Sequence, residues 1–250
     1  PPPSRQRIAT RFFNRNPFMK KHLARTLALV AGFSATSALA QVDLTESFLP
    51  MFKALPAEVP SPDNELTDAK INLGRQLYFE NRISKGAKMS CNSCHKLDAF
   101  GQDNLPFSPG HEGKLGGRSS PSTYNAALHI AQFWDGRAPS VEEQAKGPVL
   151  NPVEMAAPSE EFVIKVLKSM PEYVAAFKAA FPGEADPVTY NNFGKAVGAF
   201  ERKLLTPGKW DAFLKGNKDA LSSEEKKGFA TFAKTGCVTS KACIRKGRPG

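Results

Sequence analysis

The sequence predicts an all-α fold that is interrupted by one long irregular segment. Apolar residues recur at helical spacing in several stretches, whereas the alternation of apolar and polar residues that marks a β-strand is sustained nowhere. Residues 83–158, in contrast, are rich in Gly, Pro, Asn and Ser. A loop of this length is unusual inside a compact domain unless something other than its own core organises it. We therefore expect helices packed beside loops that wrap around a large bound group.

Five stretches carry apolar residues at the spacing of an amphipathic helix: 67–79, 159–169, 171–181, 188–204 and 222–235. Thr67 can cap the first helix, and Pro171 fits the first turn of the third. Phe193 belongs to the apolar face of the fourth. Ser222 and Glu225 form a capping box that opens the fifth.

The net charge of +10 is concentrated at the two ends of the chain. Residues 1–40 carry seven Lys or Arg and residues 237–250 carry four more, and neither segment contains an acidic residue. Residues 41–236 therefore carry a net charge of −1. A folded body of this charge does not present the basic surface of a nucleic-acid-binding protein, so no nucleic-acid partner is expected.

The first 40 residues have the pattern of an export signal. Met19 is followed by basic residues, a short apolar run at 27–33, and small residues that end at Ala40. This layout predicts a secretory signal peptide over 19–40. The apolar run is much shorter than the ~20 residues of a spanning helix, so no membrane anchor is expected. Residues 1–18 precede the start methionine and are interpreted as upstream, non-native read-through.

The motif CNSCH at 91–95 is the strongest chemical signal in the chain. Two thiols at this spacing can each add to one vinyl group of a haem, and the residue that follows then offers its imidazole to the iron. Cys91 and Cys94 are therefore predicted to bind haem c covalently, with His95 as an axial ligand.

Three other uses of these cysteines compete with haem attachment. A thioredoxin-type redox pair requires a βαβ context, which a helical chain does not provide. A structural zinc site needs four ligands, and only Cys237 and Cys243 could complete it, at an unusual spacing. A disulfide between Cys91 and Cys94 suits an exported protein but leaves His95 without a role.

Residues further along the chain could serve the second face of a haem. His111 lies among glycines that make rearrangement of its loop inexpensive, so it could reach the iron and leave it, although a lone loop histidine is more often solvated. Trp134 could form a wall of the pocket or belong to the core. Glu154 and Gln144 are polar groups on an apolar approach. Burial would raise the pKa of Glu154 and allow it to move a proton between the oxygens of a bound oxidant, whereas a solvated carboxylate would not.

Five segments, in this order and spacing, resemble the N-terminal half of the bacterial di-haem cytochrome c peroxidases: SCNSCH, SPGHEGKLGGRSSPS, AQFWDGRA, EEQAKGP and NPVEM. The resemblance covers residues 44–236. It implies an all-helical fold of two cytochrome-c-like domains that each hold one haem. Residues 41–186 would form the N-terminal peroxidatic haem domain, and residues 187–236 would form helices that lead into a truncated second domain.

The resemblance also implies roles for individual residues. The CNSCH motif would hold the peroxidatic haem, and His111 would ligate its iron in the resting enzyme and move away on activation. Glu154 would be the acid–base group for cleavage of the O–O bond, helped by Gln144. Trp134 would lie between the two haems.

The function implied is the reduction of hydrogen peroxide to water in the periplasm by a cytochrome c peroxidase, an oxidoreductase. Electrons would come from a small donor protein, a cytochrome c or a cupredoxin, and a homodimer is compatible with the family. Two alternatives are a mono-haem electron-transfer cytochrome without catalysis and a related di-haem enzyme that oxidises protein side chains.

The chain departs from the family pattern at two places. A second attachment motif is expected to begin at Cys237, but five residues separate Cys237 from Cys243, and Ile244 stands where histidine is expected. We therefore expect one attachable haem here against two in the family, and we interpret residues 237–250 as an aberrant basic tail from a frame change or cloning junction, the alternative being a divergent native tail. Ser119 replaces a calcium-binding asparagine of the family, so calcium is doubtful.

Overall fold

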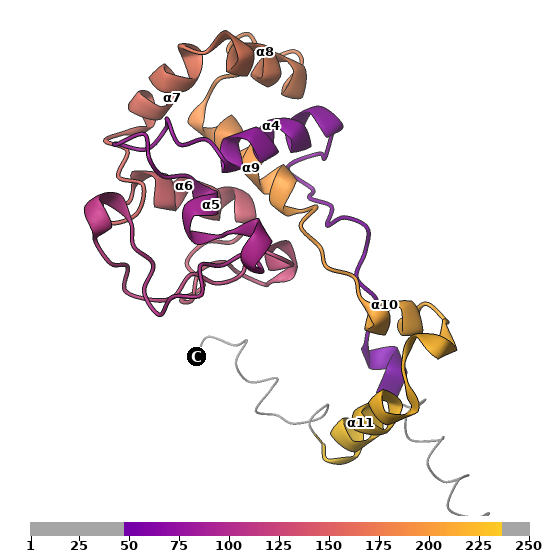
Figure 1. Cartoon of the computed structure of the whole chain (residues 1–250). Helices are drawn as coiled ribbons and strands as arrows, with labels where there is room; N and C mark the ends of the chain where they lie inside the picture. Colours follow the sequence, from indigo (N-terminus) through magenta and orange to yellow (C-terminus); the bar gives the residue numbers. More distant parts are fainter. Residues whose placement is uncertain (1–47, 237–250) are drawn as a thin grey trace, which may run out of the picture. The chain divides into compact units, whose positions relative to one another are not determined.

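The computed structural model describes residues 48–236, which form two compact units (Figure 1). The larger unit consists of residues 55–207, and the smaller unit combines residues 48–54 with residues 208–236. Across residues 48–236 the secondary structure is helical, with two isolated β-bridges and no strand. The prediction of an all-α fold is therefore confirmed.

The α-helices of the larger unit are α4 (Asp68–Tyr78), α5 (Cys91–Cys94), α6 (Val141–Leu150), α7 (Glu160–Lys168), α8 (Pro171–Ala180) and α9 (Tyr190–Glu201). The 3-10 helices between α5 and α6 are η2 (Leu97–Ala99), η3 (His111–Gly113) and η4 (Ala126–Leu128). The elements of the smaller unit are η1 (Leu49–Met51), α10 (Lys209–Leu214), η5 (Lys218–Ala220) and α11 (Ser223–Lys234).

The five stretches predicted to be helical form α4, α7, α8, α9 and α11. Thr67 caps α4 by accepting a hydrogen bond from the backbone N–H of Lys70, and Pro171 is the first residue of α8. Ser222 and Glu225 exchange the two hydrogen bonds of a capping box at the start of α11. These local signals therefore set the helix ends.

Helix α6 corrects the prediction that residues 83–158 are loop throughout. Ser140 caps it by accepting from the N–H of Glu143, and Val141, Ala145 and Val149 recur at intervals of four residues and are buried. Gly147 and Pro148 lie inside the helix near its C-terminal end. Because both residue types disfavour helices, they hide this pattern in the sequence. Packing of the apolar face outweighs the unfavourable proline.

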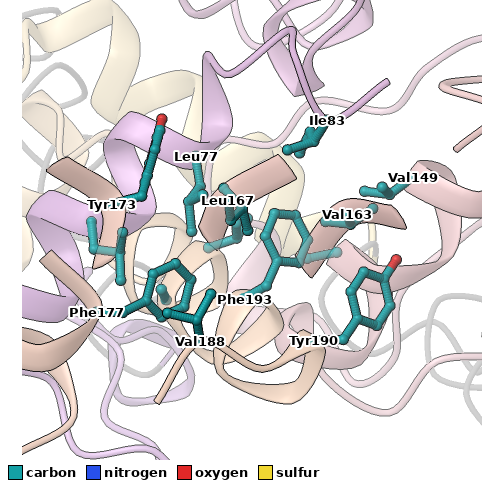
Figure 2. Close-up of a cluster of buried hydrophobic side chains, with 14 of the residues drawn as sticks. Leu77, Ile83, Val149, Val163, Leu167, Tyr173, Phe177, Val188, Tyr190 and Phe193 are labelled. Carbon is teal, nitrogen blue, oxygen red and sulfur yellow. The ribbon is translucent and has the colours of Figure 1, made fainter. Parts of the chain in front are cut away.

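The core of the larger unit lies where α9 packs against α4 and α6 (Figure 2). Leu77 of α4, Val149 of α6 and Phe193 of α9 are fully buried there. Gly74 permits the contact between α4 and α9, because a Cβ atom at this position would lie 1.8 Å from the carbonyl oxygen of Ala196. The two helix backbones are therefore in direct contact.

A buried ion pair joins α6 to the C-terminal end of α9. Arg202 donates from Nε and Nη2 to the two carboxylate oxygens of Glu142, at 2.7 and 3.0 Å. Asn64 donates to the same carboxylate at 3.0 Å, and Arg202 also donates to the carbonyl of Pro60 at 3.1 Å. These hydrogen bonds hold segment 55–64 against the helices, although the buried Oδ1 of Asn64 has no hydrogen-bond partner within residues 48–236.

The smaller unit is built around aromatic side chains. Phe52 makes edge contacts with Trp210 and Phe229, whose ring centroids lie 5.6 and 5.5 Å away. Helix α10, which brings Trp210 into this cluster, is too short to be recognised by its spacing.

Three predicted segments lie outside the described residues: the upstream segment 1–18, the signal peptide 19–40 and the tail 237–250 with its two cysteines. The expected domain boundary at 186/187 falls inside the larger unit, because α9 packs against α4 and α6. The division into haem domains stays a prediction. Within residues 48–236, every helix is too short or too polar to cross a membrane.

Candidate functional site

The CNSCH motif forms the single helical turn α5 and its C-cap residue His95. Side chains from other segments donate hydrogen bonds to the carbonyl groups at its C-terminal end. The carbonyl oxygen of Cys94 accepts a hydrogen bond from Ser120 Oγ at 2.9 Å. The carbonyl oxygen of His95 accepts from the hydroxyl of Tyr78 at 2.7 Å. Tyr78 is a buried residue of α4, so the helical core sets the position of the motif.

The imidazole of His95 is oriented by a backbone group. Its Nδ1 lies 2.9 Å from the carbonyl oxygen of Pro121, which can only accept, so Nδ1 carries the hydrogen, and in the neutral ring Nε2 then has the lone pair. Burial lowers the pKa of His95 and favours the neutral ring, whereas hydrogen bonds to the backbone at Pro121 and Gly101 act in the opposite direction. A neutral imidazole whose second nitrogen donates to a carbonyl is the usual state of a metal-binding histidine.

The two thiols carry their protons at neutral pH. Burial raises the pKa of Cys91 to about 12 and that of Cys94 to about 11. A thioredoxin-type redox pair requires a thiol with a lowered pKa, so these values disfavour that alternative. The zinc alternative needs Cys237 and Cys243, outside the described residues, and residues 48–236 contain no group of three or more His, Cys, Asp or Glu arranged to hold a metal ion.

Glu154 lies in the loop that follows α6, and its carboxyl group is partly buried. Burial raises its pKa, whereas the positive charge of Arg137 and a hydrogen bond from Asn151 act in the opposite direction. Asn151 Nδ2 donates to Glu154 Oε1 at 2.8 Å. The sequence did not single out Asn151 or Arg137 as site residues, although both lie within motifs that carry the family resemblance.

The backbone joins His111 to Glu154. The N–H of His111 donates to the carbonyl oxygens of Glu154 and Val153, at 2.8 and 3.1 Å. Gly110 makes this approach possible, because a Cβ atom there would lie 1.8 Å from the carbonyl oxygen of Val153. The same loop reaches α5, since Cys94 Sγ lies 3.9 Å from the carbonyl oxygen of Pro109. The structure therefore brings the predicted residues of three motifs together.

The ring of His111 has a buried nitrogen without a hydrogen bond. Its Nε2 is buried and makes no hydrogen bond to any residue in 48–236, although Glu112 Oε1 lies 3.5 Å away. Glu112 itself has a positive φ of 56°, which is strained for a residue with a side chain. A buried ring nitrogen in this state is an available ligand atom.

Trp134 and Gln144 are not joined to this group by hydrogen bonds in the described part of the chain. The side chain of Trp134 is exposed, and its Nε1 donates to the carbonyl oxygen of Ser119 at 2.9 Å. Gln144 is half-buried on α6, seven residues before Asn151 and therefore on the same side of the helix axis. Their roles, and the expectation about calcium at Ser119, stay predictions.

Large apolar side chains are exposed along the loops between α5 and α6. Ile130 is 85% exposed and Phe100 is 79% exposed. Further exposed apolar side chains in the same loops are Leu105, Phe107, Leu115, Leu128 and Trp134. Such exposure marks a surface that another apolar body covers. A porphyrin is such a body, and together with the two thiols of α5 and the oriented imidazole these residues fit a covalently bound haem c.

Comparison with known proteins decides the family. The family model described as di-haem cytochrome c peroxidase matches residues 68–219. The chain belongs to this family. Like the other di-haem cytochrome c peroxidases, it is therefore expected to use haem c.

Named relatives support this membership. The cytochrome c551 peroxidase of Pseudomonas aeruginosa is 41% identical over 207 residues, which are 82% of this chain and 60% of that protein. The cytochrome c551 peroxidase of Nitrosomonas europaea is 42% identical over 184 residues, which are 73% of this chain and 53% of that protein. The methylamine utilization protein MauG of Methylorubrum extorquens is 34% identical and covers 81% of this chain and 58% of that protein.

The fold agrees with the same family. The crystal structure of a MauG-like protein associated with microbial copper homeostasis superposes with a TM-score of 0.65 at 26% identity, covering 72% of this chain and 53% of that chain. This chain thus spans between about half and three fifths of the length of these relatives.

Proposed function

We propose that this chain forms the peroxide-reacting haem domain of a periplasmic cytochrome c peroxidase. The observation that carries the proposal is that the loops of His111 and Glu154 are joined by backbone hydrogen bonds. A desolvated carboxyl group and a histidine with an unbonded buried nitrogen are held together by backbone hydrogen bonds, and their loop contacts Cys94. This supplies a candidate acid–base group and a candidate second iron ligand beside the attachment motif.

The residues present would hold one haem c. Cys91 and Cys94 would form its thioether bonds, His95 Nε2 would bind its iron permanently, and His111 would be the iron ligand that is displaced. When bound, the haem supplies the iron at which peroxide is held and reduced.

Glu154 performs the proton transfer in this proposal. Its carboxylate takes the proton from one peroxide oxygen and returns it to the other, so that this oxygen departs as water rather than as hydroxide. Desolvation suits the task, because it raises the pKa of the carboxyl toward the range in which a group both accepts and releases a proton near neutral pH. Gln144 assists by hydrogen bonding. The whole reaction consumes two electrons and two protons for each hydrogen peroxide and yields two waters.

The electrons would come from a small donor protein, a cytochrome c or a cupredoxin, and the second haem expected in the family would relay them. In this scheme Trp134 would belong to the path between the two haems. Its exposed ring is consistent with a contact outside the larger unit. A homodimer remains compatible with the family resemblance.

The substitution Glu154→Gln tests the proposal. It keeps the size of the side chain and removes its capacity to accept a proton. In the haem-loaded chain, the rate at which peroxide changes the Soret spectrum should fall about a hundredfold or more, with haem content and thermal unfolding unchanged. The matched control is Glu143→Gln, an exposed carboxylate that pairs with Lys146. An unchanged rate in Glu154→Gln would favour an electron-transfer cytochrome without catalysis.

A further inference from the structure

Asn151 shapes the loop that carries Glu154. It follows α6 as the C-terminal cap, and its carbonyl oxygen accepts from the N–H groups of Glu154 and Ala156, at 3.0 and 2.9 Å. Its side-chain oxygen Oδ1 accepts from the N–H of Val153 at 3.0 Å, which is an Asx turn. The turn is thus formed by the backbone and by Oδ1 of one residue.

The other end of the same amide faces the carboxyl group. The N–H of Val153 can only donate, so the side-chain atom of Asn151 that it meets must be the oxygen. The atom 2.8 Å from Glu154 Oε1 is therefore the NH₂ group, which can only donate. The turn does not need the hydrogen bond from Asn151 Nδ2 to Glu154 Oε1, so this bond acts on the carboxyl group rather than on the turn.

Arg137 is not an equivalent donor. Its charge acts on Glu154, but its Nη1 is hydrogen-bonded to both carboxylate oxygens of Asp135 at 2.8 and 2.9 Å, and its guanidinium lies 3.5 Å from the ring centre of Phe133. Within residues 48–236, Asn151 is the side chain that hydrogen-bonds to the carboxyl of Glu154. A glutamate side chain has three rotatable bonds, so a fixed donor on one oxygen greatly limits its orientations.

We propose that Asn151 is a positioning residue, whose amide holds Glu154 Oε1 so that Oε2 is the oxygen that exchanges the proton with peroxide. The inference rests on the proposed function of Glu154. It adds a residue with a stated atom-level role, and it assigns different tasks to the two carboxyl oxygens.

Two substitutions separate the amide donor from the turn. Asn151→Asp keeps the oxygen that accepts from Val153 and replaces the donor by an acceptor. Asn151→Ser can also close the turn through its hydroxyl but is too short to reach Glu154. In the haem-loaded chain, each should slow the peroxide-driven change of the Soret spectrum about tenfold or more, the effect of losing one hydrogen bond to a charged group. Haem content and thermal unfolding should stay close to those of the unaltered chain.

The matched control is Asn217→Asp in the smaller unit. Asn217 forms the same kind of turn, with Oδ1 accepting from the N–H of Asp219 at 3.1 Å. The control makes the same chemical change in a turn that carries no site residue, and its rate should be unchanged.

Two further measurements distinguish positioning from a structural effect. The infrared carboxyl band of Glu154, identified as the band that Glu154→Gln removes, should shift in both Asn151 variants. Adding Asn151→Ser to Glu154→Gln should slow the reaction no further. If Glu154→Gln is slow but both Asn151 variants react at the normal rate with an unshifted band, the inference about Asn151 is wrong while the proposed function stands. A tenfold effect of Asn151→Ser that persists without Glu154 would also overturn it. A normal rate in Glu154→Gln would instead refute the proposed function.

Discussion

The helices and the loops of the larger unit are stabilised in different ways. Helices α4, α6 and α9 meet through fully buried side chains such as Leu77 and Phe193. The loops between α5 and α6 are held mainly by polar contacts to the backbone, for example from the Tyr124 hydroxyl to the carbonyl of Leu97 at 2.9 Å. They also leave large apolar side chains exposed.

The backbone shows the same contrast. Several residues with side chains adopt a positive φ in the loops, among them Phe100, Glu112 and Phe133. Such conformations cost free energy and persist where the surroundings enforce them. The helices therefore have a complete core of their own, whereas the loops have the features of a segment that is completed by a bound group.

Removing both thiols that are proposed to attach the haem should have the largest effect on the difference between loops and helices. In Cys91→Ala/Cys94→Ala, covalent haem should be lost entirely, as seen by haem staining after denaturing electrophoresis. Amides of the loops between α5 and α6 should then exchange with deuterium at least about tenfold faster than in the haem-loaded chain, while α4 and α9 keep their protection. Equal changes in loops and helices would show that the haem supports both regions. Cys94→Ala, which leaves one thioether, is the intermediate control.

Breaking the buried ion pair should destabilise the helical region. Arg202→Met leaves the carboxylate of Glu142 buried without its cation, so the free energy of unfolding should fall by about 3–5 kcal/mol. Denaturant unfolding of the chain measures this loss. The double variant Glu142→Met/Arg202→Met should recover much of it, because no uncompensated charge then remains. A double variant as unstable as the single one would show that packing, rather than charge, is responsible.

Glu201 should make the stability of the helical region depend on pH. Burial, followed by the negative charge of Glu142, raises the pKa of Glu201 from 4.5 to about 8. The folded state therefore binds more protons than the unfolded state between these values, and stability falls as the pH rises through them, by about 1 kcal/mol per pH unit. Glu201→Gln should remove this slope.

The comparison of Glu201→Gln with the unaltered chain cancels the contributions of other groups. Glu80 and Glu142 have lowered pKa values, so they lose their stabilising effect only as the pH falls below about 4.5. The pKa of His95 is lowered in the folded state, so His95 reduces the stability of the fold as the pH falls through the ordinary pKa of histidine, 6.5. Parallel curves of unfolding free energy against pH for the two chains would contradict the assignment to Glu201.

Local patterns predicted much of the helical region. The caps at Thr67 and Ser222 and the spacing around Phe193 depend on residues that are close in the sequence. Helix α6 was not predicted, because Gly147 and Pro148 have low helix propensity and only the tertiary packing of its apolar face overcomes this. Helix α10 has six residues, which is too few for a period to be recognised.

The site was predictable where the chemistry is local. The spacing of Cys91, Cys94 and His95 favours haem attachment over the alternative uses of these cysteines, and this assignment stays a prediction. The contact of His95 with the carbonyl of Pro121 spans 26 residues and involves a backbone atom, so no residue type indicates it. Asn151 lies three residues from Glu154, but asparagine is a common turn former, and only the folded structure shows that its amide faces the carboxyl group.

Gly110 and Gly113 have different constraints, and a mutational library of this loop would show it. At Gly110, φ is −107° and lies outside the left-handed region, but any added carbon collides with the main chain of Val153, so all nineteen other residues should be rejected alike. At Gly113, φ is 74° and no neighbour lies within 4 Å of an added Cβ, so asparagine and aspartate should survive selection where valine and isoleucine do not. Deep sequencing of the surviving variants should therefore find no substitution at Gly110, and only a few polar substitutions such as asparagine and aspartate at Gly113.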